Sequence, residues 1–440
     1  MKFAPLKFVS QLSALCLGLF LGLAVQLAEA GPQIQHWVAP SGSRVYFVES
    51  HALPILDVQV DFSAGSAYDT PSKAGLASLT HALLDMGTAR MDETQIASRL
   101  ADLGAKLSGA TEMDRASLTL RTLSAADKRV PALDILREVL VSPQFPATVF
   151  EREKARTLAA LKESLTRPET IASRAFWAAM YAGHPYGLKS TAESVALLKR
   201  DDLTQFYRTH YIAQQASVAI VGDLSRAEAE TLAQVLTANL PAGAAATAPG
   251  EPSLPVAAEQ RVAHPAAQAH LLIGVPAIKR GDPDFFPLLV GNYSLGGGGF
   301  VSRLMKEVRD KRGLAYSVYS YFQPMAQLGP FQIGLQTKKV QANDALKVAR
   351  EVLTGFLTEG PTENELSAAK QNLVGSFPLR LDSNKKILDN ISMIGFYGLP
   401  LNYLDRYAEQ VEKVTAAEIK AAFSRHVKPE HLVTVLVAGE

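Results

Sequence analysis

The sequence of 440 residues has almost no cysteine: Cys16 is the only one. It lies within the apolar run 12–27, close to the start of the chain. A chain that loses this segment has neither a disulfide nor thiol chemistry. This excludes a disulfide-stapled extracellular domain and a cysteine-dependent enzyme.

The same apolar run follows Lys2 and Lys7 and precedes Ala28-Glu29-Ala30. A basic start, a short apolar core and a small-x-small site are typical of a secretory signal peptide, so we expect residues 1–30 to be cleaved off after Ala30. The alternative, an uncleaved membrane anchor, needs a longer apolar run. An exported chain without disulfides or a stable membrane anchor indicates the bacterial periplasm.

Charge of one sign is also missing. The chain has 44 basic and 43 acidic residues, a net charge of +1, and no long run of either sign. Nucleic acid is therefore not an expected partner. With 48% hydrophobic and 20% charged residues the chain is globular, and its length predicts two or more domains.

Complete catalytic motifs are absent. None of the nine histidines forms His-x-x-x-His or His-x-x-Glu-His, and neither Gly-x-Ser-x-Gly nor a Walker loop occurs. No catalytic constellation is complete in this chain, which argues against an enzyme that acts alone.

An Ala-, Gly- and Pro-rich stretch divides the chain into two similar parts. Residues 240–256 have no apolar period, and their prolines disfavour both helix and strand. We interpret them as a linker between a first domain, 31–239, and a second domain, 257–440.

The two domains repeat one pattern. Each ends with a helix, a short break and a β-branched run, and Tyr207 and His210 correspond to Phe423 and His426. Each also begins with an extended apolar run ("LDVQVDFSAG" and "HLLIGVPA") and has its long helices late. This order predicts an α+β fold of two homologous domains, each an antiparallel sheet with helices packed on one face.

The stretch "GLASLTHALLDMGT", residues 75–88, predicts a helix with Leu76, Leu79, Leu83 and Met86 inward and Gly87 just after its end. Its one polar pair one turn apart is His81 and Asp85. A catalytic metal needs three protein ligands, so we expect a His81–Asp85 hydrogen bond on a partly exposed face. A metal held by this pair is the alternative.

A denser stretch, "YSLGGGGFVSRLMKEVRDKRGLAYSVYSYF", follows in the second domain. We expect its four consecutive glycines to form a mobile loop whose N–H groups meet a peptide or an anion; these are Gly296, Gly297, Gly298 and Gly299. Residues 300–311 predict a helix, and Tyr316 begins a strand. Arg309 and Tyr316 then flank one turn and converge, or are an ordinary helix-end cation and strand aromatic.

These stretches resemble the pitrilysin/insulinase-type zinc peptidases, most closely the two-domain branch that includes mitochondrial processing peptidase. That family has "GLAHxxEHMxxxGT" where this chain has "GLASLTHALLDMGT". Ser78 stands at the first zinc histidine, His81 at the glutamate base and Ala82 at the second zinc histidine. The later ligand glutamate falls in "TLAALKESLTRP", at Ala159 or Ala160. The resemblance thus implies no zinc in this chain.

Other marks of the family are intact, among them "HPYG" at 184–187 and the glycine-rich signature of the second domain. In working members, an arginine and a tyrosine seven positions apart reach the substrate at the zinc, as Arg309 and Tyr316 are spaced here. Some members divide the site between two subunits. The resemblance therefore implies a catalytic role for Arg309 and Tyr316 and substrate binding by the glycines, in a heterodimer with a homologous zinc-bearing subunit that cleaves peptides. A structural or peptide-binding subunit is the alternative.

Overall fold

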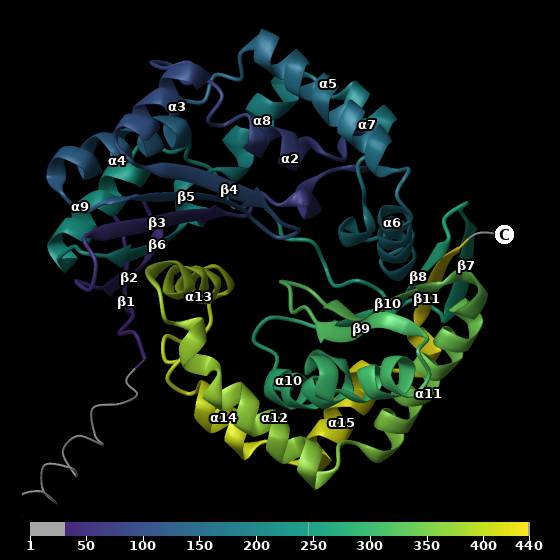
Figure 1. The fold of residues 1–440 in the computed structure, drawn as a ribbon. Helices are drawn as coiled ribbons and strands as arrows, with labels where there is room; N and C mark the ends of the chain where they lie inside the picture. The colour runs from purple at the N-terminus through teal and green to yellow at the C-terminus, as the bar shows by residue number, and fades with distance from the viewer. Residues whose placement is uncertain (1–30, 245, 439–440) are drawn as a thin grey trace, which may run out of the picture.

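The computed structural model describes residues 31–244 and 246–438, so the expected signal peptide lies outside the described residues. Two halves, each built on one sheet, curve toward one another, with the first half purple to teal and the second green to yellow (Figure 1). Within the described ranges, no helix combines the length and the apolar character needed to cross a membrane.

The first half contains a six-stranded sheet of order β1-β2-β6-β3-β5-β4. Its strands are β1 (Gln35–Val38), β2 (Arg44–Glu49), β3 (Ile55–Phe62), β4 (Lys106–Thr111), β5 (Ala116–Leu123) and β6 (Ser217–Gly222). The second half has a five-stranded sheet of order β7-β11-β8-β10-β9. Its strands are β7 (Ala258–Ala263), β8 (Gln268–Ile278), β9 (Ala315–Phe322), β10 (Gly329–Lys338) and β11 (Val433–Ala438).

The strand order reveals the duplication. Without β1, the first sheet reads β2-β6-β3-β5-β4 and matches β7-β11-β8-β10-β9 position by position. The sequence pattern predicted antiparallel sheets. Both sheets are instead mixed, because β6 runs parallel to β2 and β11 runs parallel to β7. Each of these last strands follows a long helical connection, which permits parallel pairing where a tight hairpin does not.

Helices other than α6 and α13 cover the outer face of each sheet and bury the larger core of each half. The helices of the first half are α2 (Leu76–Ala82), α3 (Glu93–Asp102), α4 (Ala126–Val141), α5 (Ala147–Ser164), α6 (Pro168–Met180), α7 (Ala192–Leu197), α8 (Arg200–His210) and α9 (Arg226–Thr237). In the second half they are α10 (Phe285–Asn292), α11 (Ala342–Glu359), α12 (Glu363–Gly375), α13 (Asn384–Tyr397), α14 (Tyr407–Lys413) and α15 (Ala416–His426). Between α9 and β7, where the sequence suggested a linker, the described residues (all but 245) form no helix or strand.

One helix from each half packs on the other half's sheet. Helix α6 lies against β8 and β11 (Figure 1). Phe176 and Met180 of this helix belong to the same buried apolar cluster as Val435 of β11. Helix α13 lies against β3 and β6, with Leu388 and Ile391 in a small apolar cluster. The two halves are therefore joined by exchanged helices as well as by the linker.

Because α13 covers the inner face of the first sheet, the polar residues of β3 are buried. Ser392 of α13 donates a 2.6 Å hydrogen bond to Asp61, and Gln59 donates one of 2.7 Å to Ser392. Arg115 also contacts Asp61, at 3.3 Å. Burial raises the pKa of Asp61 despite this positive neighbour. The alternating polar residues of β3 thus form a buried seam between the halves and not a solvent-exposed face.

Candidate functional site

Helix α2 carries the degenerate zinc motif and is held at its start by Asp69. The two carboxylate oxygens of Asp69 accept 2.8 Å hydrogen bonds from the backbone N–H groups of Gly75 and Ala77. Gly75 has φ of +101°, a conformation that glycine adopts without strain. Burial raises the pKa of Asp69 to about 6 although both N–H groups favour its charge.

The end of α2 differs from the expectation. The helix stops at Ala82, so Gly87 does not follow its last residue. Gly87 instead forms a β-bridge with Asp92, at φ of +142°. A Cβ atom there would lie 2.8 Å from a ring carbon of Pro146, so glycine is required at this position by packing and not by helix termination.

The positions that correspond to zinc ligands are accessible but carry no ligand. Ser78 and Ala82 lie one turn apart on α2 and are both exposed. Ala159 and Ala160 on α5 are exposed as well. Methyl groups and one hydroxyl replace the nitrogen and carboxylate ligands that zinc requires, so these residues do not fit a zinc ion.

His81 does not hydrogen-bond to Asp85, which corrects the second expectation for this helix. Its Nε2 atom lies 2.8 Å from the backbone oxygen of Ser117 on β5, to which it donates. Burial lowers the pKa of His81, which favours the neutral ring. His81 therefore joins α2 to the first sheet through its Nε2–H group.

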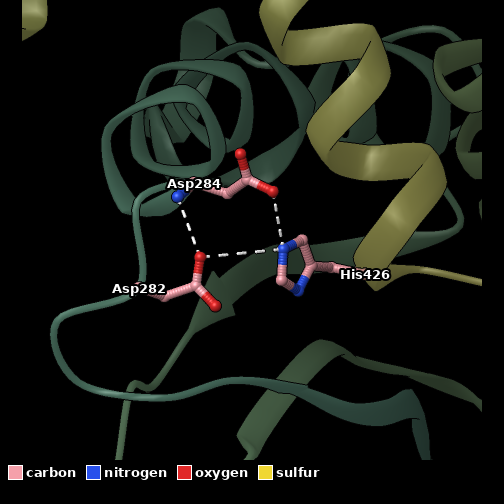
Figure 2. Close-up of side chains that lie close together, drawn as sticks. All are labelled: Asp282, Asp284 and His426. Atoms are coloured by element: carbon pink, nitrogen blue, oxygen red, sulfur yellow. Dashed lines mark hydrogen bonds and ion pairs between the residues drawn. The ribbon is translucent and has the colours of Figure 1, made fainter.

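Among the described residues, one group of metal-ligating side chains lies within 4.8 Å of one another: Asp282, Asp284 and His426 (Figure 2). His426 Nδ1 donates to the oxygen of Ala277 at 2.7 Å, and Nε2 lies 2.9 Å from Asp284. Arg425 donates to both oxygens of Asp284, at 2.8 and 2.7 Å. This group is an ion-pair network that ties the end of α15 to the start of α10, and Arg425 already occupies the carboxylate that a metal would need.

His426 was noted in the sequence only as the counterpart of His210. The structure shows what they share: His210 Nδ1 lies 3.0 Å from the oxygen of Ser63, just after β3, and His426 makes the same contact with Ala277 near the end of β8. Both histidines connect a late helix to the long strand of their own half.

Arg309 and Tyr316 are brought together in the second half. The guanidinium of Arg309 lies 5.5 Å from the centroid of the Tyr316 ring and 4.8 Å from that of Phe300. Its nearest carboxylate, Asp310, is 4.0 Å away. Tyr316 is 86% exposed and Phe300 68% exposed, so both rings face solvent, while Arg309 is half-buried between them. The cluster offers hydrogen-bond donors that no protein group occupies fully.

The glycine stretch is not the mobile loop that the sequence suggested. Gly296 and Gly297 lie inside a π-helical turn, Tyr293–Gly297, that continues α10, and the N–H of Gly298 bonds to the oxygen of Tyr293 at 2.9 Å. A Cβ on Gly296 would lie 2.5 Å from the backbone nitrogen of Ser320, so close packing on β9 explains this glycine. Gly299, at φ of +59°, is exposed.

The expected helix over 300–311 is also irregular. A 3-10 turn, Gly299–Val301, precedes a π-helical turn, Met305–Asp310. Leu304 and Val308 are buried as the apolar spacing predicts. The wider turn places Arg309 near the start of β9, beside Tyr316.

Asp114, which lies in the turn between β4 and β5, is a residue that no sequence pattern had indicated. Its carboxylate accepts hydrogen bonds from Tyr186 Oη at 2.5 Å, from Tyr397 Oη at 2.9 Å and from the N–H of Ala326 at 2.8 Å. Tyr397 and Ala326 belong to the second half, so the hydrogen bonds to this buried aspartate connect the two halves. A lone aspartate in a predicted turn has no pattern that distinguishes it from a surface residue.

Comparison with known proteins agrees with this geometry. Residues 44–193 match the family described as "Insulinase (Peptidase family M16)", and residues 198–373 match "Peptidase M16 inactive domain". A protein of Helicobacter pylori named "Non-peptidase homolog YmxG" is 29% identical over 98% of both chains. A protein of Streptomyces coelicolor named as an uncharacterized zinc protease is 27% identical and covers 81% of this chain and 79% of its own.

Solved structures show the same fold. The structure described as a peptidase M16 inactive domain from Pseudomonas fluorescens is 38% identical, covers 92% of this chain and 98% of its own, and superposes with a TM-score of 0.89. A protease structure from Helicobacter pylori, 18% identical over 93% of this chain and 100% of its own, gives a TM-score of 0.86 and supports the fold alone. The chain therefore belongs to the insulinase (M16) family of peptidases, as a member whose own metal-ligand positions are lost.

Proposed function

We propose that this protein is the non-zinc subunit of a heterodimeric peptidase of the periplasm, in which a homologous partner bears His-x-x-Glu-His. The single observation that carries this proposal is a contrast within one chain. The zinc and base positions, Ser78, His81 and Ala82, hold no zinc ligand, whereas Arg309 and Tyr316 lie together, with Tyr316 exposed and Arg309 half-buried.

The expected chemistry of Arg309 and Tyr316 follows from their donors. A guanidinium and a phenol hydroxyl donate hydrogen bonds, and the developing negative charge on a peptide carbonyl oxygen accepts them. Arg309 is stacked on Phe300 and Tyr316, which restricts its motion before substrate arrives. In the partner subunit, zinc with a glutamate base supplies the activation of water.

The glycine stretch has a narrower role than the sequence suggested. Gly296 is buried and serves packing, while Gly297 and Gly299 are exposed close to Phe300. We assign to the exposed glycines the contact with the backbone of a bound peptide, since the absence of a Cβ lets another chain approach closely.

The periplasmic location rests on the sequence of residues 1–30 and on Cys16 as the single cysteine. A cleaved export signal followed by a cysteine-free chain suits a compartment where thiols are oxidised.

A second function, a purely structural or peptide-binding subunit, is favoured by the name of the Helicobacter pylori relative, "Non-peptidase homolog YmxG". In that case Arg309 and Tyr316 contribute packing and no catalysis. The two functions differ in whether a zinc-bearing partner depends on this chain.

The test is peptide cleavage by the partner mixed with wild-type chain or with Arg309→Lys, Tyr316→Phe or Tyr316→Ala. Loss of one such donor typically lowers kcat by roughly 100- to 1,000-fold. Tyr316→Phe keeps the ring beneath Arg309 and removes only the hydroxyl, so it isolates hydrogen bonding from stacking. Arg350, which pairs with Glu259, provides the control Arg350→Lys.

Undiminished turnover with both Arg309→Lys and Tyr316→Phe would refute the catalytic role. If the partner also has the same activity without this chain, the structural function is correct instead.

A further inference from the structure

A cavity of about 400 Å³ lies at the seam between the two halves. The β4–β5 turn and Trp177 of the first half line it on one side, and Arg280, the β9–β10 turn and Tyr397 of the second half line it on the other. This volume is within the range of small-ligand pockets, which lie preferentially at domain interfaces.

Arg280 is the charged side chain of this cavity that has a buried nitrogen without a hydrogen-bond partner. Its guanidinium lies 5.2 Å from the centroid of the Tyr397 ring, and its Nε is buried without a hydrogen-bond partner. Across residues 31–244 and 246–438 no carboxylate forms an ion pair with it. A buried donor without an acceptor is costly, and a bound anion removes that cost.

The other charges of the cavity are already satisfied. Glu112 accepts a 3.0 Å hydrogen bond from Arg115, which also contacts Asp61. Asp114 is held by two tyrosine hydroxyls and one backbone N–H. These two carboxylates line the same cavity, so a dianion such as phosphate is repelled more strongly than a monoanion.

The cavity wall is mainly polar, but one part of it favours an apolar group attached to that anion. Trp177, Met113, Met325 and Pro324 line the cavity together with the hydroxyl-bearing Ser66 and Thr111. Lys189 lies over the Trp177 ring at 4.7 Å, and the described part of the chain offers it no acidic partner. A second cation therefore adds positive potential beside the cavity.

We propose that this cavity binds the C-terminal carboxylate of a peptide that ends in an apolar residue, with Arg280 as its partner. A planar carboxylate matches the two parallel donors of a guanidinium. The choice of a peptide rests on the proposed function, but the site itself is independent of Arg309, Tyr316 and the partner's zinc.

Binding is measured with the isolated chain, so cleavage plays no part. Trp37 and Trp177 are the two tryptophans of the sequence, and Trp37→Phe leaves Trp177 as the reporter on the cavity wall. The probes are acetyl-Ala-Ala-Leu with a free carboxylate, the same peptide with a C-terminal amide, and inorganic phosphate. We expect the free acid to change Trp177 fluorescence saturably and the amide to bind at least about tenfold more weakly, as for a hydrogen bond to a charged group.

Arg280→Gln is expected to weaken the free acid to the level of the amide, with Arg280→Lys intermediate. Arg380, which lies over the Tyr407 ring at 5.7 Å, gives the matched control Arg380→Gln, expected to bind as wild type. Arg309→Lys is also expected to bind as wild type, which separates this site from the proposed catalytic residues.

Equal binding of acid and amide overturns the proposal, as does phosphate that displaces the acid with equal affinity. Absence of binding overturns it too. Binding seen by calorimetry without a change in Trp177 fluorescence means that the ligand binds elsewhere, for example in the neighbouring cavity of about 280 Å³ that Arg280 also lines, and also overturns the proposal.

Discussion

The Tyr397 hydroxyl, at the end of α13, donates a 2.9 Å hydrogen bond to the carboxylate of Asp114, in the β4–β5 turn of the other half. The N–H of Ala326 reaches the same oxygen from the β9–β10 turn. Two turns at equivalent positions of the duplicated halves thus meet at one buried carboxylate. The halves are fastened by exchanged helices and by this contact.

Asp114→Ala is expected to lower the free energy of unfolding by about 3 kcal/mol or more. Three donors lose their acceptor, and each buried unsatisfied group costs about 1–3 kcal/mol. Urea denaturation followed by circular dichroism measures the loss. Tyr397→Phe removes one of the three bonds and serves as the comparison, with a loss near 1 kcal/mol. Equal stability of wild type and Asp114→Ala would show that this contact does not hold the halves together.

Asp69 makes stability depend on pH in a known direction. Its pKa is raised from 3.8 to about 6 in the folded protein, so the folded state holds this proton more tightly than the unfolded chain. The free energy of unfolding therefore falls as the pH rises from about 4 to about 6, and above this range Asp69 no longer changes it. The loss is roughly 3 kcal/mol at most, because one pKa unit is worth about 1.4 kcal/mol.

The measurement is the free energy of unfolding against pH for wild type and Asp69→Asn. The variant cannot titrate, so the difference between the two curves reports this group alone. If the free energy of unfolding of the wild type rises relative to that of the variant between pH 4 and pH 6, the pKa of Asp69 is not raised in the folded protein.

Gly296→Ala tests whether the glycine stretch is packed or mobile. Its new Cβ would lie 2.5 Å from the backbone nitrogen of Ser320, so we expect a loss of about 2 kcal/mol or more. Gly355→Ala is the control, because this helical position in α11 has open space around it. There we expect a gain of about 0.5–1 kcal/mol from helix propensity. If Gly296→Ala does not change the free energy of unfolding, the glycine stretch is a mobile loop as the sequence suggested.

Phe300 is expected to position Arg309 for the partner's substrate. Phe300→Ala removes one of the two rings that hold the guanidinium, a contact worth about 0.5–1 kcal/mol at an exposed site. The kcat/KM of the reconstituted pair should fall about two- to fivefold and return in Phe300→Tyr. The exposed neighbour gives the control Val301→Ala. An effect of equal size in Val301→Ala would mean that this surface acts through general contact only.

The sequence predicts the strands and the duplicated order of elements, because alternation and β-branched runs mark them locally. It does not predict which sheet α6 and α13 cover, because the apolar pattern of a helix does not identify the element against which the helix packs. In the sequence, the alternating polar residues of β3 look like a solvent-exposed face. Ser392, which donates a hydrogen bond to Asp61 and helps to bury it, is far away in the chain.

At the site, spacing placed Arg309 beside Tyr316, but it misjudged groups whose partners are distant. His81 bonds to Ser117 on a strand instead of to Asp85 one turn away. The glycines looked flexible because composition alone does not show the packing of Gly296 on Ser320. Asp114 was missed because its partners come from three separate segments.

The most direct test of the account is the initial rate of peptide cleavage for three samples: this chain alone, the zinc-bearing subunit alone, and an equimolar mixture. We predict no cleavage by this chain alone and a mixture that is faster than the zinc-bearing subunit alone. Cleavage by the isolated, homogeneous chain that a metal chelator abolishes would contradict the account.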